Sequence, residues 1–341
     1  MIYIRVDANA RIAMGHLMRT ISIAEAIREL GSEVCFITAD NNCDAKLKEH
    51  NFERICLNSI WSDMNREIPL IKQMILKKDI KCLLVDSYFV TKEYFEELSE
   101  ITNLVYMDDF KILPTKCKAI INYVLGETTK GLEHLKNELY MGAEYVPLRK
   151  EFMQSAQRFF CEKIERILVT TGGSDELHFG KNFMYAILND ERFRECQISL
   201  VVGSKNEDKE FLLSEYKKVK NVSIYVDAKN MSELMQEADC MVSAGGTTLY
   251  EACACKLPTV SYAVADNQLL NVHKFDALGG IYFAGDIRDG INEVVEKILD
   301  RLQQMQQVEL RENIAKCMGK VVDGKGAYRI ADILIKIERN E

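Results

Sequence analysis

The sequence lacks the long apolar runs that would place it in a membrane. No stretch approaches the roughly 20 apolar residues that a membrane helix needs, and the first residues already read as a strand rather than a targeting peptide. The eleven cysteines are odd in number and lack the spacing of zinc sites. We expect them to be reduced, mostly buried thiols. These absences predict a cytoplasmic protein without stable membrane insertion.

The chain is also short of basic charge and of the common nucleotide motifs. Its net charge of −8 argues against binding to nucleic acid. No Gly-Lys-Ser/Thr follows P-loop spacing, and no Gly-x-Gly-x-x-Gly follows the first predicted strand. The five histidines show no metal-ligand spacing, so we expect no metal and no cofactor. A phosphorylated small ligand is still compatible with this composition, because backbone amides bind phosphate locally.

What is present is a strong alternation of short apolar strands and amphipathic helices. The 341 residues suffice for two domains, and this βαβ rhythm predicts parallel sheets with helices on both faces. The rhythm breaks over residues 124–150 and then resumes. We expect an α/β architecture of two doubly wound, Rossmann-type domains, residues 1–146 and 147–322, and a helical extension, residues 323–341, that packs back on them. A cleft between such domains would face the carboxyl ends of both sheets.

The predicted strands and the main predicted helices follow from this pattern. The strands are Tyr3–Asp7, Glu33–Thr38, Arg54–Leu57, Cys82–Asp86, Leu104–Asp108, Ala119–Tyr123, Arg166–Thr171, Gln197–Val202, Val222–Val226, Cys240–Ser243, Thr259–Tyr262 and Ile281–Ala284. The helices are Leu17–Leu30, Asp63–Lys77, Thr91–Ile101, Glu293–Met318 and Gly326–Lys336.

One histidine lies where α/β proteins place their ligands. Gly15 and His16 end the loop after the first strand, with Asp7 and Asn9 upstream at the strand end. A histidine there can carry a proton at neutral pH, and Asp7 or Asn9 could orient the imidazole or a water molecule. The alternative is that His16 caps or packs its helix.

Two glycine turns in the second half suit a phosphate. Gly172, Gly173 and Ser174 follow one predicted strand, and the second turn, Gly245-Gly246-Thr247-Thr248, follows another. Glycines let the backbone approach a phosphate, and a helix N-terminus adds free N–H groups. Glu251, one helical turn later, could accept hydrogen bonds from a ribose diol. Plain turn geometry and a solvated helix glutamate are the alternatives.

Other polar residues close predicted strands or open predicted helices. Tyr88, after Asp86, could contact a sugar ring. The amides of Asn267 and Gln268 suit sugar hydroxyls or N-acetyl groups, although helix capping explains them as well. Helix capping is also the simpler explanation for Asp108.

Taken in order, these segments resemble the UDP-2,4-diacetamido-2,4,6-trideoxy-β-L-altropyranose hydrolase family of pseudaminic acid biosynthesis and the related spore coat polysaccharide proteins. The resemblance spans roughly residues 3 to 285. It rests on the Gly15-His16 loop, the segments Val85–Tyr88, Met107–Asp109 and Leu148–Phe152 with Arg149, the two glycine turns, the segment around Met231, and Asn267-Gln268. Ser87, the glycine-threonine turn and the C-terminal extension depart from compact family members, which leaves the sugar open.

The resemblance implies a GT-B-like fold and a UDP-sugar substrate. By that resemblance the glycine turns contact the diphosphate, Glu251 contacts the ribose and backbone groups near Met231 read the uracil. His16 maps onto the family's catalytic histidine, Tyr88 onto its active-site tyrosine and Asn267 onto its active-site asparagine. The implied reaction is hydrolysis at the anomeric carbon, and other enzymes of the same sugar pathway are possible partners. An inverting UDP-sugar glycosyltransferase and a non-catalytic nucleotide-sugar-binding subunit stay open as alternatives.

Overall fold

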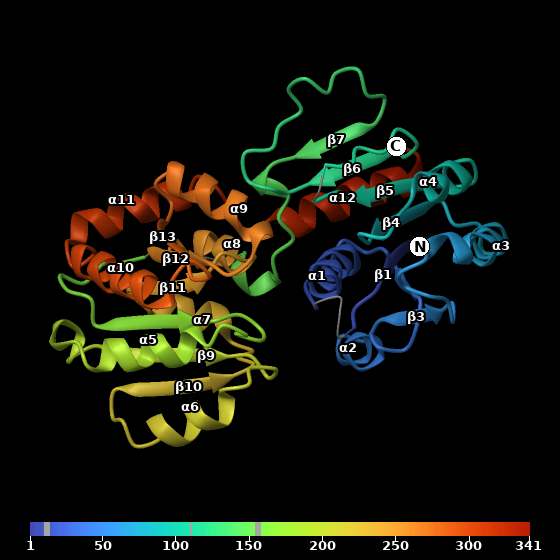
Figure 1. The fold of residues 1–341 in the computed structure, drawn as a ribbon. Coiled ribbons are helices and arrows are strands. Elements are labelled where there is room, and N and C mark those ends of the chain that lie inside the picture. Colours follow the sequence, from blue (N-terminus) through green and yellow to red (C-terminus); the bar gives the residue numbers. More distant parts are fainter. Residues whose placement is uncertain (10–13, 110, 154–157) are drawn as a thin grey trace. The chain divides into compact units, whose positions relative to one another are not determined.

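The computed structural model describes residues 1–9, 14–109, 111–153 and 158–341. The chain forms two compact units, each described here by itself (Figure 1). Unit 1 consists of Met1–Lys150 together with Gly324–Glu341, and unit 2 consists of Glu151–Asp323. Unit 2 is therefore inserted, along the sequence, between two segments of unit 1.

Unit 1 is built on a seven-stranded parallel sheet in the order β3-β2-β1-β4-β5-β6-β7. The central strands β1 and β4 are buried along their whole length, as expected for parallel strands covered on both faces. The strands are β1 (Ile2–Val6), β2 (Val34–Thr38), β3 (Glu53–Cys56), β4 (Cys82–Asp86), β5 (Asn103–Met107), β6 (Ala119–Asn122) and β7 (Glu138–Met141). The helices are α1 (Gly15–Glu29), α2 (Asp44–Glu49), α3 (Ile68–Lys78), α4 (Lys92–Ser99) and α12 (Gly326–Arg339), with 3-10 turns η1 (Met64–Glu67) and η2 (Ala143–Tyr145).

Helix α12 follows unit 2 in the sequence yet packs on α1 and on the sheet of unit 1. Its apolar stripe includes Ile330, Ala331 and Leu334, all with no exposed surface. The helix begins at Gly326, where a Cβ atom would lie 2.1 Å from the carbonyl oxygen of Val146. Only glycine allows this close approach of the two backbones.

Unit 2 is built on a six-stranded parallel sheet in the order β10-β9-β8-β11-β12-β13. Its strands are β8 (Arg166–Thr170), β9 (Gln197–Val202), β10 (Val222–Val226), β11 (Cys240–Ala244), β12 (Thr259–Ala263) and β13 (Tyr282–Asp286). Its helices are α5 (Phe179–Leu188), α6 (Lys209–Tyr216), α7 (Met231–Glu237), α8 (Thr248–Ala254), α9 (Asp266–Ala277), α10 (Ile291–Gln304) and α11 (Val308–Met318). The short turns η3 (Lys150–Phe152) and η4 (Glu191–Phe193) complete the elements.

Two doubly wound parallel sheets confirm the predicted architecture, with two local corrections. The prediction of an irregular connection over residues 124–150 was wrong at β7, a four-residue edge strand that pairs with β6. Only Met141 of β7 is buried, so its sequence carries little apolar pattern. The predicted helix Glu293–Met318 is divided into α10 and α11.

In both units the strand order reverses at one point, where α/β sheets bind their ligands. This switch point lies between β1 and β4 in unit 1, and between β8 and β11 in unit 2. The residues that follow these four strands are the best placed for function.

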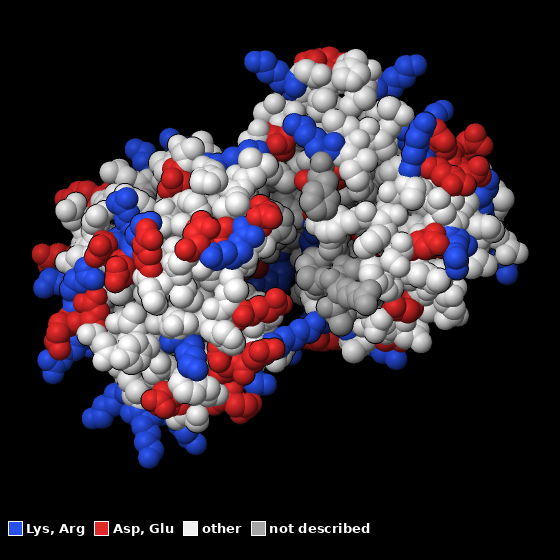
Figure 2. Space-filling model, in the orientation of Figure 1, with Lys and Arg blue, Asp and Glu red and all other residues white. Residues whose placement is uncertain are grey.

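None of the helices in the described part of the chain has the length and apolar character needed to cross a bilayer. On the face shown in Figure 2, basic and acidic side chains are interspersed.

Candidate active site

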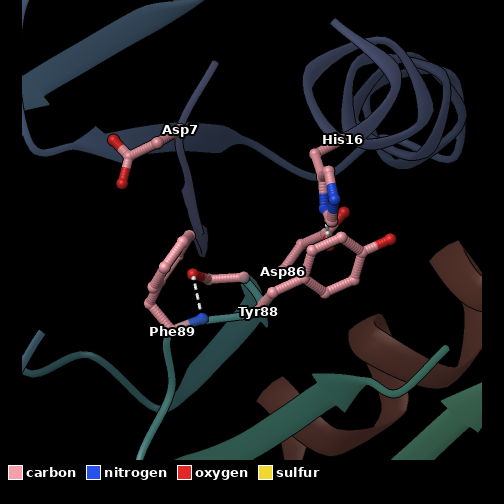
Figure 3. Close-up of a pocket in the computed structure, with 6 residues that line it drawn as sticks. Asp7, His16, Asp86, Tyr88 and Phe89 are labelled. Carbon is pink, nitrogen blue, oxygen red and sulfur yellow. Dashed lines mark hydrogen bonds and ion pairs between the residues drawn. The ribbon is translucent and has the colours of Figure 1, made fainter. Parts of the chain in front are cut away.

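The switch point of unit 1 holds a small cavity beside His16 (Figure 3). His16 lies in the first turn of α1, and Asp86 ends β4 opposite Val6 of β1. The cavity has a volume of about 10 Å³, close to the least that one water molecule needs. Its lining residues are Asp7, His16, Asp86, Ser87, Tyr88 and Phe89.

Asp86 fixes the orientation of the imidazole. The distance from Nδ1 of His16 to Oδ1 of Asp86 is 2.6 Å, and both side chains are buried. Burial alone would raise the pKa of Asp86, but Arg19 and His16 outweigh burial and lower this pKa to about 2. Asp86 is therefore a carboxylate at neutral pH, and Nδ1 donates its proton to it. This tautomer leaves Nε2 as a proton acceptor.

Arg19 holds Asp86 in place. Its Nε donates to Oδ2 of Asp86 over 2.6 Å, and its Nη2 donates to Oδ1 over 2.5 Å. Its Nη1 donates to Oδ2 of Asp109 over 2.5 Å and to the hydroxyl of Tyr123 over 2.6 Å. Neither Arg19 nor the contact between Asp86 and His16 was predicted from the sequence. The sequence does carry a signal for Arg19. Residues three positions apart on a helix lie on the same face, and Arg19 follows His16 by three residues on α1.

Tyr88 lies against the imidazole of His16. The two rings meet edge to face, with centroids 4.3 Å apart and an interplanar angle of 81°. The hydroxyl of Tyr88 donates to Oδ2 of Asp109 over 3.0 Å. Burial, and then the negative charge of Asp109, raise the pKa of Tyr88, so the phenol stays protonated at neutral pH.

Asp7 lines the cavity, but the carboxylate that is hydrogen-bonded to the imidazole is that of Asp86, so of the two predicted roles for Asp7 only the orientation of a water molecule stays open. Its Oδ2 accepts from Nη1 of Arg5 over 2.6 Å, and its Oδ1 accepts from the N–H of Ala39 over 2.7 Å. Figure 3 shows the carboxylate directed away from the imidazole. Burial, partly offset by Arg5, raises the pKa of Asp7. Arg5 itself is fully buried and bound by both oxygens of Glu67.

The remaining predicted residues of unit 1 lie around this cavity or farther along the chain. Asn9 is half-buried two residues beyond Asp7, and Gly15 is the first residue of α1, with open space where a Cβ atom would be. Arg149 is half-buried near the end of the first segment of unit 1. None of the three lines the cavity.

The two glycine turns lie side by side at the switch point of unit 2. They follow the paired strands β8 and β11, in which Thr170 lies opposite Ser243. Gly172 adopts a φ of +80°, which favours glycine. A Cβ atom on Gly172, Gly173 or Gly246 would meet only open space, so these backbones are accessible to a ligand.

The helix termini behind the two turns differ, which corrects one expectation. The N–H groups of Phe179 and Gly180, at the start of α5, donate to the carboxylate of Asp175 over 2.9 Å each. This terminus is therefore already capped by a protein anion. Helix α8 instead begins at Thr248, directly after the second turn, and no side chain caps it at Thr247. The N–H of Leu249 donates to the carbonyl oxygen of Gly246 over 3.2 Å, and the N–H of Tyr250 donates to that of Thr247 over 3.0 Å.

The other predicted residues of unit 2 occupy nearby helix starts. Glu251 is half-buried in the first turn of α8, and Met231 is the buried first residue of α7. Oε1 of Gln268 accepts from the N–H of Val264 over 3.0 Å, so this amide shapes the loop before α9. Ser174 is half-buried, with its hydroxyl 3.4 Å from Oε1 of Glu176. The backbone of Asn267 belongs to α9, and its side chain lies outside the described part of the structure.

Metal ligands are not gathered at either site. In the part of the chain that the structure describes, no group of three or more His, Cys, Asp and Glu side chains is arranged to hold a metal ion.

The fold places the chain in the GT-B structural class. It is similar to the crystal structure of MurG from Acinetobacter baumannii, with a TM-score of 0.71 and 12% identity over 98% of this chain and 99% of that one. Residues 166–328, which lie mostly in unit 2, match the family model of the glycosyltransferase family 28 C-terminal domain.

Relatives with similar sequences agree with the resemblance drawn from the motifs. The chain is 25% identical to the spore coat polysaccharide biosynthesis protein SpsG of Bacillus subtilis, over 98% of both chains. It is 23% identical to the UDP-2,4-diacetamido-2,4,6-trideoxy-β-L-altropyranose hydrolase of Campylobacter jejuni, over 77% of this chain and 92% of that protein. An uncharacterised protein of Methanocaldococcus jannaschii is 26% identical over 76% of this chain. The match covers 54% of that protein, so this chain spans about half the length of this relative.

Proposed function

We propose that this protein hydrolyses a UDP-linked amino-deoxy sugar at the anomeric carbon, releasing UDP and the free sugar. The observation that carries the proposal is the cavity of about 10 Å³ beside an imidazole whose Nδ1 is bound to Asp86. The names of the relatives support nucleotide-sugar chemistry in pseudaminic-type or spore coat polysaccharide biosynthesis.

In the proposed reaction His16 acts as the general base. Nε2 removes a proton from a water molecule as the water oxygen attacks C1 of the sugar. The imidazolium that forms is stabilised by the carboxylate of Asp86, which already accepts the Nδ1 proton. The bond from C1 to the diphosphate oxygen breaks in the same displacement, so the configuration at C1 inverts. We propose that Tyr88, whose ring packs edge to face on the imidazole, contacts the sugar.

The leaving diphosphate is assigned to unit 2. We propose that the second glycine turn, through Thr247 and Thr248 at the start of α8, stabilises the charge that develops on the diphosphate oxygen. In this proposal Glu251, in the first turn of the same helix, binds the ribose hydroxyls. In the same proposal, backbone groups near Met231 recognise the uracil. Asn267 and Gln268 would lie on the sugar side of the same ligand.

A glycosyltransferase is the second candidate, because the family model matched by residues 166–328 is that of a glycosyltransferase domain. In that reaction His16 would deprotonate a sugar hydroxyl instead of water. UDP release that requires an added acceptor would identify this activity. UDP-sugar binding without turnover would identify a binding subunit.

The decisive experiment is hydrolysis of a panel of UDP-sugars in ¹⁸O-labelled water. We expect the label on C1 of the released sugar and UDP as the other product. Label on the phosphate would overturn attack at C1. Turnover close to that of the wild type in His16→Ala would overturn the assignment of the base.

A further inference from the structure

Unit 2 contains a second, larger cavity that the proposed reaction does not use. Its volume is about 370 Å³, within the lower range of small-molecule sites. We call it the basic pocket, and its lining includes Arg158, Phe160, Lys256, Glu312, Lys316 and Lys320. Four of its eight lining residues are cations and one, Glu312, is an anion, in a chain whose net charge is −8.

The basic pocket is separate from the glycine turns. The second glycine turn precedes the N-terminus of α8, whereas Lys256 follows the C-terminus of the same helix. Seven residues of helix, about 10 Å at 1.5 Å per residue, separate the two positions. Phe160 precedes β8, so it lies toward the amino ends of the parallel strands. The glycine turns lie at their carboxyl ends.

The three lysines of the pocket carry charge that no carboxylate neutralises. Among the described residues, no ion pair is recorded for the ammonium group of Lys256, Lys316 or Lys320, and Glu312 is the one carboxylate in the lining. The stem of Lys256 lies across Gly319, where a Cβ atom would be 3.0 Å from Cε of the lysine. Gly319 has a φ of −65°, which any residue adopts, and a Cβ atom there would displace only the flexible end of the Lys256 side chain.

Two arginines add positive charge, the half-buried Arg158 in the lining of the pocket and the buried Arg311 behind it. Arg158 donates to the carbonyl oxygens of Met235, Ala238 and Cys255 over 2.5, 2.5 and 3.1 Å. Arg311 has no exposed surface, and its guanidinium lies 5.9 Å from the ring centroid of Phe160. Its Nη2 donates to the carbonyl oxygens of Cys161 and Glu162, while Nε and Nη1 have no hydrogen-bond partner among the described residues. Charge in a low-dielectric interior acts strongly on a nearby anion.

We infer that the basic pocket binds a small phosphorylated ligand. The free ammonium groups of Lys256, Lys316 and Lys320 contact the phosphate oxygens, because lysine binds phosphate as a point charge. Phe160 forms the apolar wall of the site, and the two arginines supply a fixed positive potential. The site is independent of the proposed hydrolysis, so either assignment can fail without the other.

Lysine acetylation followed by mass spectrometry tests the site residue by residue on the full chain. We expect inorganic pyrophosphate to slow acetylation of Lys256, Lys316 and Lys320 at least threefold. Lys217 and Lys218, exposed beyond α6 in the same unit, are internal controls whose rates should not change. Equal protection of all five lysines, or no protection of the pocket lysines, would overturn the inference.

Calorimetry with matched variants provides the second measurement. The double variant Lys256→Gln/Lys316→Gln should weaken pyrophosphate binding at least tenfold, and Lys217→Gln/Lys218→Gln should leave the affinity unchanged. Gly246→Asp, which places a negative charge at the glycine turn, should leave protection of the pocket lysines intact. Loss of that protection in Gly246→Asp would overturn the inference, and so would protection by anionic phospholipid vesicles but not by pyrophosphate.

Discussion

At the scale of single residues, Arg19 connects the groups that surround His16. Its guanidinium binds Asp86, Asp109 and Tyr123 at once. We expect Arg19→Met to lower kcat more than it raises KM, because Asp86 loses the cation that keeps it ionised. Removing one partner from a buried pair also costs roughly 3–5 kcal/mol of stability. Arg19→Lys should recover part of the activity.

The Arg19 variants are checked by kcat and KM across pH together with urea unfolding. Arg28→Met, at the exposed end of the same helix, is the matched control. If Arg19→Met lost only stability, with its kcat and pH profile unchanged in the folded fraction, Arg19 would have no positioning role.

The pair of His16 and Asp86 gives a second prediction. His16→Ala should lower kcat by about 10²–10⁴-fold, as expected for loss of a general base. Asp86→Asn should also lower kcat, because the imidazole loses the acceptor that fixes its tautomer. Single-turnover rates with a UDP-sugar measure both effects. Asp79→Asn, at the exposed C-terminus of α3, should react like the wild type.

The acid stability of the chain should depend on Asp86. Its pKa in the folded protein is about 2, below the ordinary value of 3.8. A lowered pKa stabilises the fold above pH of about 4, and this stabilisation is lost as pH falls toward about 2. The shift corresponds to on the order of 2 kcal/mol. Between pH 5 and pH 2.5, the free energy of unfolding should therefore fall by about 2 kcal/mol more in the wild type than in Asp86→Asn.

Urea unfolding at the two pH values separates this effect from others. Asp86→Asn also loses contacts with Arg19, but that loss is the same at both pH values. Parallel acid losses in the two proteins would show that Asp86 does not titrate as described.

At the scale of elements, the start of α12 depends on one close approach. Gly326→Ala should destabilise the protein by about 1–3 kcal/mol, because its Cβ atom would collide with the backbone of Val146. Gly280→Ala is the control, since a Cβ atom there meets its nearest neighbour at 3.6 Å, an ordinary contact. Thermal unfolding of the two variants makes the comparison, and equal melting temperatures would contradict the prediction.

The regular elements were predictable from the sequence because their apolar patterns are strong. Central strands such as β1 and β4 are mostly apolar and buried along their whole length, whereas β7 is a half-exposed edge strand without such a pattern. The sequence alone could not show which carboxylate contacts His16. Asp7 is closer to His16 in the sequence, but Asp86 lies beside His16 because β4 pairs with β1. The capping of α5 by Asp175 likewise depends on how the loop folds back.

At the scale of the whole molecule, the two units should respond differently to loss of α12. A chain ending at Asp323 lacks the helix that covers part of unit 1, so the apolar surface opposite Ile330 and Leu334 becomes exposed. We expect limited proteolysis to degrade residues of unit 1 and to leave a resistant fragment containing residues 166–318. Equal resistance of both units in this variant would contradict the prediction.

The insertion of unit 2 within unit 1 also has a consequence for biosynthesis. A chain leaves the ribosome from its N-terminus, and domains generally fold as they emerge. Unit 2 can complete its sheet as soon as β13 and the following helices have been made. Unit 1, although its strands emerge first, must wait for α12 until all of unit 2 has been translated. The unit that carries His16 is thus the last to mature, and each nascent chain passes through a stage in which that unit alone is incomplete.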